Sequence, residues 1–290
     1  MTYVPHSDAD RKAMLAAIGV RSVDELLAVV PEGVRFPQVT LPAPLSEAEV
    51  LRELREMSEA NADLDHYACF LGAGAYRHYI PSVVQHVIGR SEFYTAYTPY
   101  QPEISQGTLH AIFEYQSMIC RLTGMDVANA SMYDGGTALA EAVNLAVSKT
   151  GRKKVLLSGA IHPNYLGILK TYGKAAGWKI ELSSYDPKTG TTPMPKISDQ
   201  YAAYIIQQPN FFGSIEEVQG LADAIHKAGA LFIAVVDPIS LGLLKKPGDY
   251  TADIVVGEGQ SLGLPQAYGG PYLGIFAARS AFMRQMPGRI

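Results

Sequence analysis

Two glycines and a threonine, Gly135, Gly136 and Thr137, open a helical pattern directly after a strand-like stretch. The glycines let backbone N–H groups come close to a ligand, and the threonine adds a hydroxyl at the positive end of the helix dipole. This chemistry suits a phosphate group. The same residues would also form a tight strand-to-helix turn capped by the threonine, and the sequence leaves both interpretations open.

A histidine and an aspartate follow two of the later strand-like stretches. His162 comes after residues 155–158 and precedes Pro163, so its ring could stack on a flat ligand or serve as an ordinary surface or helix-cap residue. Asp237 ends the most apolar stretch, where a carboxylate is poorly solvated and needs a partner. That partner could be a protonated ring nitrogen, a backbone N–H or a serine such as Ser240.

Alternating strand-like and helix-like segments must position these residues. Short apolar stretches predict strands at 127–130, 155–158, 180–183, 203–207, 230–236, 254–256 and 272–277. Helical patterns are found at 106–122, 137–148, 165–176 and 215–227. Such alternation predicts an α/β fold, a mostly parallel sheet with helices on both faces, whose functional residues collect at the carboxyl ends of the strands.

The first part of the chain has a different character. The pattern of residues 1–64 predicts an arm of short helices separated by proline-rich connections. Three serines begin these helices, each with an acidic residue three positions later: Ser7, Ser22 and Ser46. Such an arm buries little surface by itself, so we expect it to lie across the main domain or across a partner. Residues 65–290 are expected to form the large domain.

Composition and charge argue against several classes of function. The chain has 290 residues and a formal net charge of -4, which gives no reason to expect a nucleic-acid or acidic-membrane partner. No histidine pairs with a cysteine at metal-ligand spacing. Cys69 and Cys120 lie far apart, each beside apolar or aromatic residues, which favours buried free thiols in a reducing compartment. The longest apolar stretch, 230–236, is far too short for a membrane span, and the polar start shows no signal pattern, so we expect a cytoplasmic protein.

The order of these elements resembles the layout of fold-type I pyridoxal-phosphate enzymes, where they bind the phosphate, stack on the ring and pair with the pyridine nitrogen. The resemblance implies a cofactor-binding lysine roughly two dozen residues after Asp237. Gln260 or Ser261 stands in that place instead. The lysines after Asp237 are Lys245 and Lys246, which come too early and indicate a solvated turn. Without the lysine, this chain cannot hold the cofactor covalently.

Longer motifs make the resemblance specific. Residues 97–107, Tyr-Thr-Pro-Tyr-Gln-Pro-Glu-Ile-Ser-Gln-Gly, are similar to the signature of glycine dehydrogenase (decarboxylating), the P-protein of the glycine cleavage system. Further matching stretches lie at 70–76, 133–138, 236–242, 257–260 and 268–271, with His78 and Pro81. The likeness covers nearly the whole chain. It is to the subunit 1 type of chain, which is equivalent to the N-terminal half of the single-chain form.

This resemblance implies a fold-type I, aspartate-aminotransferase-like large domain with an N-terminal helical arm, and a C-terminal small domain missing beyond Ile290. It also implies a reaction shared by two chains. With a lysine-bearing glycine dehydrogenase subunit 2, glycine is decarboxylated on pyridoxal phosphate and the aminomethyl group passes to the lipoyl arm of the H-protein. The cofactor is expected on the partner subunit, in a pair of heterodimers.

The resemblance further implies a site completed across the subunit interface by residues 94–106. The candidates in this segment are Tyr94, Tyr97, Thr98, Tyr100, Gln101, Ser105 and Gln106. They could line a lipoyl channel or bond the cofactor phosphate, or the segment could be a rigid packing loop that only holds the two chains together. A degenerate cofactor pocket would then remain at Gly135, Gly136, Thr137, His162, Asp237, Gln260 and Ser261.

Two other functions remain open. A structural or regulatory homologue would keep the fold and catalyse nothing, whereas a decarboxylase acting alone would need the lysine that is missing. Glycine–bicarbonate exchange by the chain together with a lysine-bearing partner would separate a shared enzyme from the structural homologue. An absorbance band of covalently held cofactor in the chain alone would identify the independent decarboxylase.

Overall fold

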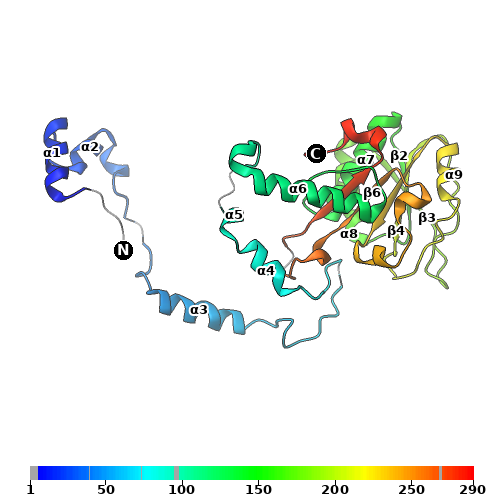
Figure 1. Ribbon diagram of the computed structural model, residues 1–290, viewed down its shortest axis with the longest axis horizontal. Helices are drawn as coiled ribbons and strands as arrows, with labels where there is room; N and C mark the ends of the chain where they lie inside the picture. Colours follow the sequence, from blue (N-terminus) through cyan, green and yellow to red (C-terminus); the bar gives the residue numbers. More distant parts are fainter. Residues whose placement is uncertain (1–5, 39, 73, 95–97, 268–269) are drawn as a thin grey trace. The chain divides into compact units, whose positions relative to one another are not determined.

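The structure is a computed structural model that describes residues 6–38, 40–72, 74–94, 98–267 and 270–290 (Figure 1). The chain divides into two compact units, residues 1–67 and 68–290. The helices are α1 Asp8–Ile18, α2 Val23–Leu26, α3 Glu47–Glu59, α4 Ser82–Ile88, α5 Ser91–Tyr94, α6 Pro102–Thr123, α7 Gly135–Thr150, α8 Pro163–Ala176 and α9 Leu221–Lys227. The strands are β1 Val127–Ala128, β2 Lys154–Ser158, β3 Lys179–Ser183, β4 Tyr201–Gln208, β5 Leu231–Val236, β6 Ile254–Glu258 and β7 Gly274–Ala278.

The first unit contains the short helices that the serine-led patterns predict. Ser7 and Ser46 form complete capping boxes at the starts of α1 and α3. Ser22 accepts the backbone N–H of Glu25 at the start of α2, but the Glu25 carboxylate accepts from the backbone and side chain of Arg21 instead of closing the box. That the unit lies across the main domain or across a partner stays a prediction.

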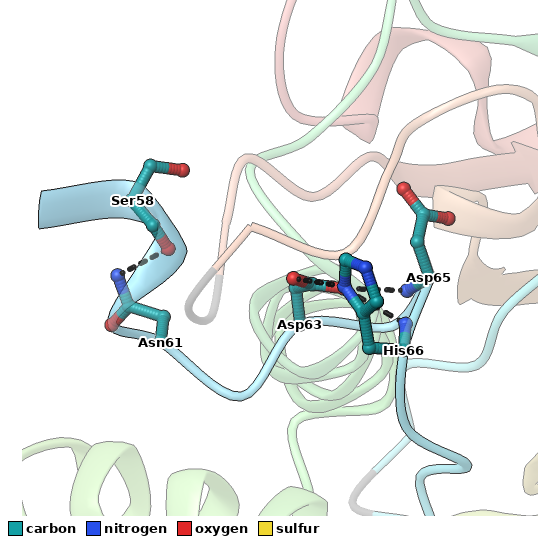
Figure 2. A network of polar contacts seen from close by, with 5 residues as sticks. All are labelled: Ser58, Asn61, Asp63, Asp65 and His66. Carbon is teal, nitrogen blue, oxygen red and sulfur yellow. Dashed lines mark hydrogen bonds and ion pairs between the residues drawn. The ribbon is translucent and has the colours of Figure 1, made fainter. Parts of the chain in front are cut away.

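After α3 the chain turns around Asp63 (Figure 2). Oδ1 of Asp63 accepts the backbone N–H groups of Asp65 at 2.8 Å and of His66 at 3.0 Å. Oδ2 of the same carboxylate lies 2.8 Å from Nδ1 of His66. Aspartate side chains commonly fix turns in this way, because they accept backbone N–H groups two and three residues ahead. The turn therefore contains an exposed histidine–carboxylate pair.

A seven-stranded sheet forms the centre of the second unit, in the order β1-β7-β6-β5-β4-β2-β3. Strands β3, β2, β4, β5 and β6 are parallel to one another, and β7 runs antiparallel to both β6 and β1. Each of the strands predicted from sequence is present, with its ends within two residues of the expected positions. The prediction of a mostly parallel sheet is confirmed.

Helices cover both faces of the sheet, as predicted. Alternate residues of β5 point to opposite cores: Ile233 and Val235 pack with α7 on one side, and Phe232 and Ala234 pack with α6 and α9 on the other. Both faces are buried, so the parallel strands are almost continuously apolar. Helix α7 contacts both the sheet and α8, which explains its run of buried small and aliphatic residues.

Two helix boundaries differ from the sequence prediction. Helix α9 begins at Leu221 instead of residue 215, because Glu216 is buried in an extended stretch and its carboxylate accepts the backbone N–H of Thr192 at 2.7 Å. Helix α6 begins at Pro102, four residues before the predicted start. Proline has no N–H to lose at a first helical position, so it favours a start there.

The prediction that both cysteines are buried is wrong for one of them. Cys69 is exposed, whereas Cys120 is half-buried on α6. The neighbours of Cys69, Phe70 and Leu71, are 94% and 89% exposed. Apolar composition around Cys69 therefore reflects an irregular stretch that does not pack on the sheet.

Candidate functional site

A pocket of about 140 Å³ lies at the carboxyl edge of the parallel strands, the edge that the sequence predicts. Four of the predicted residues line it: His162, Asp237, Gln260 and Ser261. They follow the ends of β2, β5 and β6. The sheet thus brings together His162 and Ser261, which are 99 positions apart in the sequence. No lysine lines the pocket among the described residues.

His162 is both a helix cap and a pocket residue, and that its ring stacks on a ligand stays a prediction. Its Nδ1 accepts the backbone N–H of Asn164 at 3.0 Å, which caps α8. Its own backbone N–H donates to Oε1 of Gln207 at 2.8 Å. The ring stacks on Tyr165, with centroids 5.0 Å apart, and meets Phe211 edge to face at 5.0 Å. The ring is thus held by aromatic neighbours of its own chain.

Asp237 differs from the sequence expectation of a poorly solvated carboxylate. It is exposed at the end of β5, and its Oδ1 accepts the backbone N–H of Ile239 at 2.9 Å. Of the three partners considered, the structure therefore provides the backbone N–H. Ser240 donates to the main-chain oxygen of Asp237 and not to its carboxylate. The carboxylate is exposed because the strand ends at Val236 and the chain turns at once into solvent.

Gly135 and Gly136 are the first residues of α7, but their small size has a packing cause. A Cβ atom on Gly135 would lie 2.5 Å from Oη of Tyr165, and one on Gly136 would overlap Cδ1 of Ile168. Both of these neighbours belong to α8. The glycines therefore allow α8 to approach the start of α7, and the space beside them is filled by this chain's own side chains.

The cap of α7 also differs from the expected threonine cap. Asp134 is the N-cap residue, and its Oδ1 accepts the backbone N–H of Thr137 at 2.8 Å. The Thr137 hydroxyl lies 3.3 Å from the backbone N of Asp134, which donates to it, and 3.1 Å from the main-chain oxygen of Asp134. Thr137 thus closes a capping box, and its hydroxyl is engaged within the turn.

Glu258, which ends β6, completes this arrangement. Its Oε2 accepts the backbone N–H of Gly135 at 2.9 Å, and its Oε1 accepts those of Gln260 and Leu273, each at 2.9 Å. Burial raises the pKa of the Glu258 carboxyl, although the three backbone bonds oppose this shift. Burial, with a smaller effect of the Glu258 charge, also raises the pKa of Tyr115 to about 12.

These contacts test whether the pocket fits pyridoxal phosphate. The N–H of Gly135 is the group that would meet a phosphate at this helix start, and a carboxylate already accepts it. The volume beside Gly135 and Gly136 is filled by Tyr165 and Ile168. The residues present therefore do not fit the phosphate of the cofactor.

Gln260, one of the two residues at the expected lysine position, is 3% exposed. Its Oε1 accepts the backbone N–H of Tyr76 at 3.4 Å, and its Nε2 donates to the main-chain oxygen of Leu264 at 2.6 Å. Ser261, the alternative occupant of that position, lies beside it and is only partly buried. The amide of Gln260 is thus engaged at both ends in holding the pocket walls.

The tyrosine–proline segment forms a second, separate group of candidates. Tyr97 lies outside the described residues, as does the side chain of Tyr94, whose backbone ends α5. Among the described residues, 98–106 do not line the pocket. Of its described residues, only 98–101 lie in a loop, because residues from Pro102 onward belong to α6.

The described part of the segment is held in place at two points. Ser105 is 5% exposed and has non-helical angles, φ -127° and ψ 28°, inside α6. Arg289 donates to the main-chain oxygen of Pro99 at 2.5 Å, and its guanidinium lies 5.1 Å from the ring centroid of Tyr100. The remaining candidates, Thr98, Tyr100, Gln101 and Gln106, are exposed.

Sequence reasoning missed several pocket residues, among them Tyr76, Tyr165, Gln207, Phe211 and Glu258. A carboxylate that ends an apolar strand is a usable signal for Glu258, since it needs donors there. Within the part of the chain that the structure describes, no three His, Cys, Asp or Glu side chains gather to hold a metal ion. In the same ranges, no helix has the length and apolar character needed to cross a membrane.

Comparisons with known proteins agree on one family. A family model described as glycine cleavage system P-protein matches residues 1–290. A protein of Bacillus mycoides named probable glycine dehydrogenase (decarboxylating) subunit 1 is 51% identical over 293 residues, which cover 99% of this chain and 65% of that protein. The chain thus spans about two thirds (65%) of the length of this curated relative.

Solved structures show the same likeness. A crystal structure of glycine decarboxylase (P-protein) of the glycine cleavage system, in inhibitor-bound form, matches with a TM-score of 0.87 and 49% identity, over 100% of this chain and 65% of that one. The sphingosine-1-phosphate lyase of Burkholderia pseudomallei matches with a TM-score of 0.63 at 13% identity, over 88% of this chain and 64% of that one, and shows the fold alone. The predicted fold-type I pyridoxal-phosphate enzyme fold is confirmed.

Proposed function

The chain belongs to the glycine cleavage system P-protein family, and we propose that it is the subunit of a glycine dehydrogenase (decarboxylating) that carries no cofactor lysine. The observation that carries this proposal is the pocket lining, which has Gln260 and Ser261 at the expected lysine position and no lysine among the described residues; the buried Gln260 amide bonds to the backbone of Tyr76 and Leu264. Neither glutamine nor serine can form an imine, so the covalent chemistry belongs to another chain.

In the proposed enzyme a lysine-bearing glycine dehydrogenase subunit 2 binds pyridoxal phosphate. There the cofactor acts as the electron sink for the decarboxylation of glycine. The aminomethyl group then passes to the lipoyl group of the H-protein. This chain contributes a surface to the shared site and no group of its own pocket. A pair of heterodimers in the cytoplasm remains the predicted assembly and location.

The exposed part of segment 98–106 is the surface that we assign to the shared site. Its backbone is bonded to Arg289 at Pro99, and Ser105 is buried in the first turn of α6. Fixed backbone with exposed tyrosine and glutamine side chains suits contact with a ligand or a partner chain, because little ordering entropy is lost on binding. Tyr100 is 70% exposed despite its guanidinium neighbour.

The test is glycine–bicarbonate exchange by the chain co-purified with a lysine-bearing subunit 2 and supplied with lipoylated H-protein. The complex should exchange labelled bicarbonate into glycine, and this chain alone should not. If a stable complex with cofactor-loaded subunit 2 exchanges nothing, the chain is a structural or regulatory homologue and the proposed function is wrong.

A pair of glutamine variants tests the role of the segment within that complex. Gln106→Ala should lower turnover about tenfold, the loss expected from one hydrogen bond made in the transition state. Gln219→Ala, an exposed glutamine in the turn before α9, is the matched control and should leave turnover unchanged. Equal rates for Gln106→Ala and the unaltered chain, in complexes of equal stability, would assign the segment to packing.

A further inference from the structure

The carboxylate of Glu258 joins the start of α7 and the segment before β7 to the end of β6. Gly135, the first residue of α7, lies 123 positions before it, and Leu273 lies 15 positions after it. All three bonds to backbone N–H groups, including that of Gln260, measure 2.9 Å. Proteins hold bound anions in the same way, with several N–H donors directed at one anionic group.

The charge of Glu258 suits the position. The start of a helix carries a partial positive charge and free N–H groups, which favour an anion there. Asp134 already places one carboxylate at the cap of α7, and Glu258 adds a second within reach of its electrostatic influence. A phosphate brought to the same place would meet two fixed negative charges, which disfavour a third.

The volume at this position is also taken. A Cβ atom on Gly135 would lie 2.5 Å from Oη of Tyr165, and the backbone of Gly257 and Glu258 lies within 3.0 Å of the same point. Ile168 covers Gly136 from α8. The glycine-rich helix start is therefore covered by α8 and by the end of β6, and the Glu258 carboxylate fills the space in front of the Gly135 N–H.

We propose that Glu258 is an internal replacement for a ligand phosphate, so that this pocket rejects phosphorylated ligands whether or not a lysine is present. The remaining pocket, with the His162 ring and the exposed Asp237 carboxylate, is left for uncharged or cationic small molecules. This proposal concerns the chain's own pocket and does not rest on the shared glycine dehydrogenase function. In a two-chain enzyme it would keep the cofactor from dividing between two similar pockets.

The experiment uses the purified full chain and pyridoxine 5′-phosphate, which has no aldehyde and so cannot react with surface lysines. The unaltered chain should show no saturable binding in equilibrium dialysis up to about 1 mM, a concentration that would reveal even weak sites. Phosphate strengthens apolar burial in any protein, so the difference between the melting temperatures of the unaltered chain in sodium phosphate and in sodium chloride of equal ionic strength serves as the baseline. Saturable binding of pyridoxine 5′-phosphate that inorganic phosphate displaces would overturn the proposal.

Removal of the Glu258 carboxylate should allow phosphate to bind, and this binding can be measured. Glu258→Ala should melt lower than the unaltered chain in chloride. Inorganic phosphate should raise the melting temperature of this variant by about 3 °C more than it raises that of the unaltered chain, because an anion that binds only the folded chain stabilises it. Glu217→Ala removes an exposed carboxylate that accepts one backbone N–H, and it should respond as the unaltered chain does. A folded Glu258→Ala chain that phosphate stabilises no more than it stabilises the unaltered chain would contradict the proposal.

Glu258→Ser keeps the experiment decisive if the alanine variant does not fold. The short serine side chain leaves the space in front of the Gly135 N–H, which the Glu258 carboxylate fills in the unaltered chain, and it keeps a polar group at the end of β6. Phosphate should raise the melting temperature of this variant more than that of the unaltered chain. If the alanine variant is unfolded and phosphate has no such additional effect on the serine variant, the proposal is wrong. The bicarbonate exchange of the complex is a separate measurement, so failure of one proposal is not failure of the other.

Discussion

The side-chain nitrogen of Gln260 donates to the main-chain oxygen of Leu264 at 2.6 Å and so closes the turn that follows β6. The oxygen of the same amide accepts the backbone N–H of Tyr76 at 3.4 Å. The side chain therefore fastens the turn after β6 to Tyr76, which lies 184 positions before Gln260. A residue in this arrangement serves structure, although it is one of the two residues at the place where a catalytic lysine would be expected.

Restoring a lysine should not restore cofactor binding. In Gln260→Lys both amide bonds are lost and a charge is buried, so the free energy of unfolding should fall by about 1–3 kcal/mol, measured by urea denaturation. Incubation with pyridoxal phosphate followed by borohydride reduction should give no pyridoxyl group at position 260 in peptide mass spectra. Ser261→Lys places a lysine at the other candidate position, and this variant should also give no pyridoxyl group at the new lysine. Stoichiometric labelling at either position would contradict the interpretation of the pocket.

A buried carboxylate also shapes the wall opposite the β6 turn. Glu216, 3% exposed, accepts the backbone N–H of Thr192 at 2.7 Å and Nδ2 of Asn210 at 2.9 Å. Asn210 lines the pocket, so this network positions the loop that carries Phe211.

Loss of this network should be costly. Glu216→Ala should lower the free energy of unfolding by about 3 kcal/mol, because three buried donor groups, the N–H and hydroxyl of Thr192 and Nδ2 of Asn210, lose their acceptor and a void is left. Glu217→Gln, the adjacent exposed position, should change it by less than about 0.5 kcal/mol. Urea denaturation followed by circular dichroism measures both. A Glu216→Ala chain as stable as the Glu217→Gln control would show that the network does not hold the loop.

The sheet could be predicted from sequence because its strands are buried on both faces. Phe232 and Ile233 point to opposite cores, so residues 231–236 are apolar without interruption and are unmistakable as a strand. His162 and Asp237 could be placed at one edge for a related reason. Each follows the end of a parallel strand, and such ends meet at the same side of a sheet.

Other features depend on contacts between distant residues, which a single sequence does not reveal. The bond from Gly135 to Glu258 joins a helix start to a strand 123 positions later, so the glycine-rich motif alone allows either a phosphate or a carboxylate partner. Residues 215–220 have helical periodicity, yet Glu216 is drawn into an extended stretch by Thr192 and Asn210. In both cases tertiary contacts override a local pattern.

The two thiols should differ in reactivity. Cys69 is exposed, whereas burial raises the pKa of the half-buried Cys120, with a smaller contribution from the charge of Asp126. The thiolate is the reactive form, so at neutral pH a disulfide reagent such as DTNB should label Cys69 at least about tenfold faster. Cys69→Ser should abolish the fast phase, and Cys120→Ser the slow one. Equal rates in the native chain, as expected in denaturant, would disprove the difference.

The histidine–carboxylate pair of the first unit should titrate together (Figure 2). The hydrogen bond with Asp63 raises the pKa of His66, and the bond with His66 lowers the pKa of Asp63. The raised histidine pKa means that the pairing is complete below the pKa of unfolded histidine and is lost as pH rises through the folded value. The lowered aspartate pKa means that the pairing is also lost as pH falls through the folded pKa of Asp63.

NMR titration of the His66 ring measures the pKa of this histidine. Asp63→Asn should lower that pKa clearly. Asp65→Asn should lower it only slightly, because Asp65 contributes the smallest of the effects on His66. Equal shifts in the two variants would mean that general charge, and not the bond at 2.8 Å, sets the pKa.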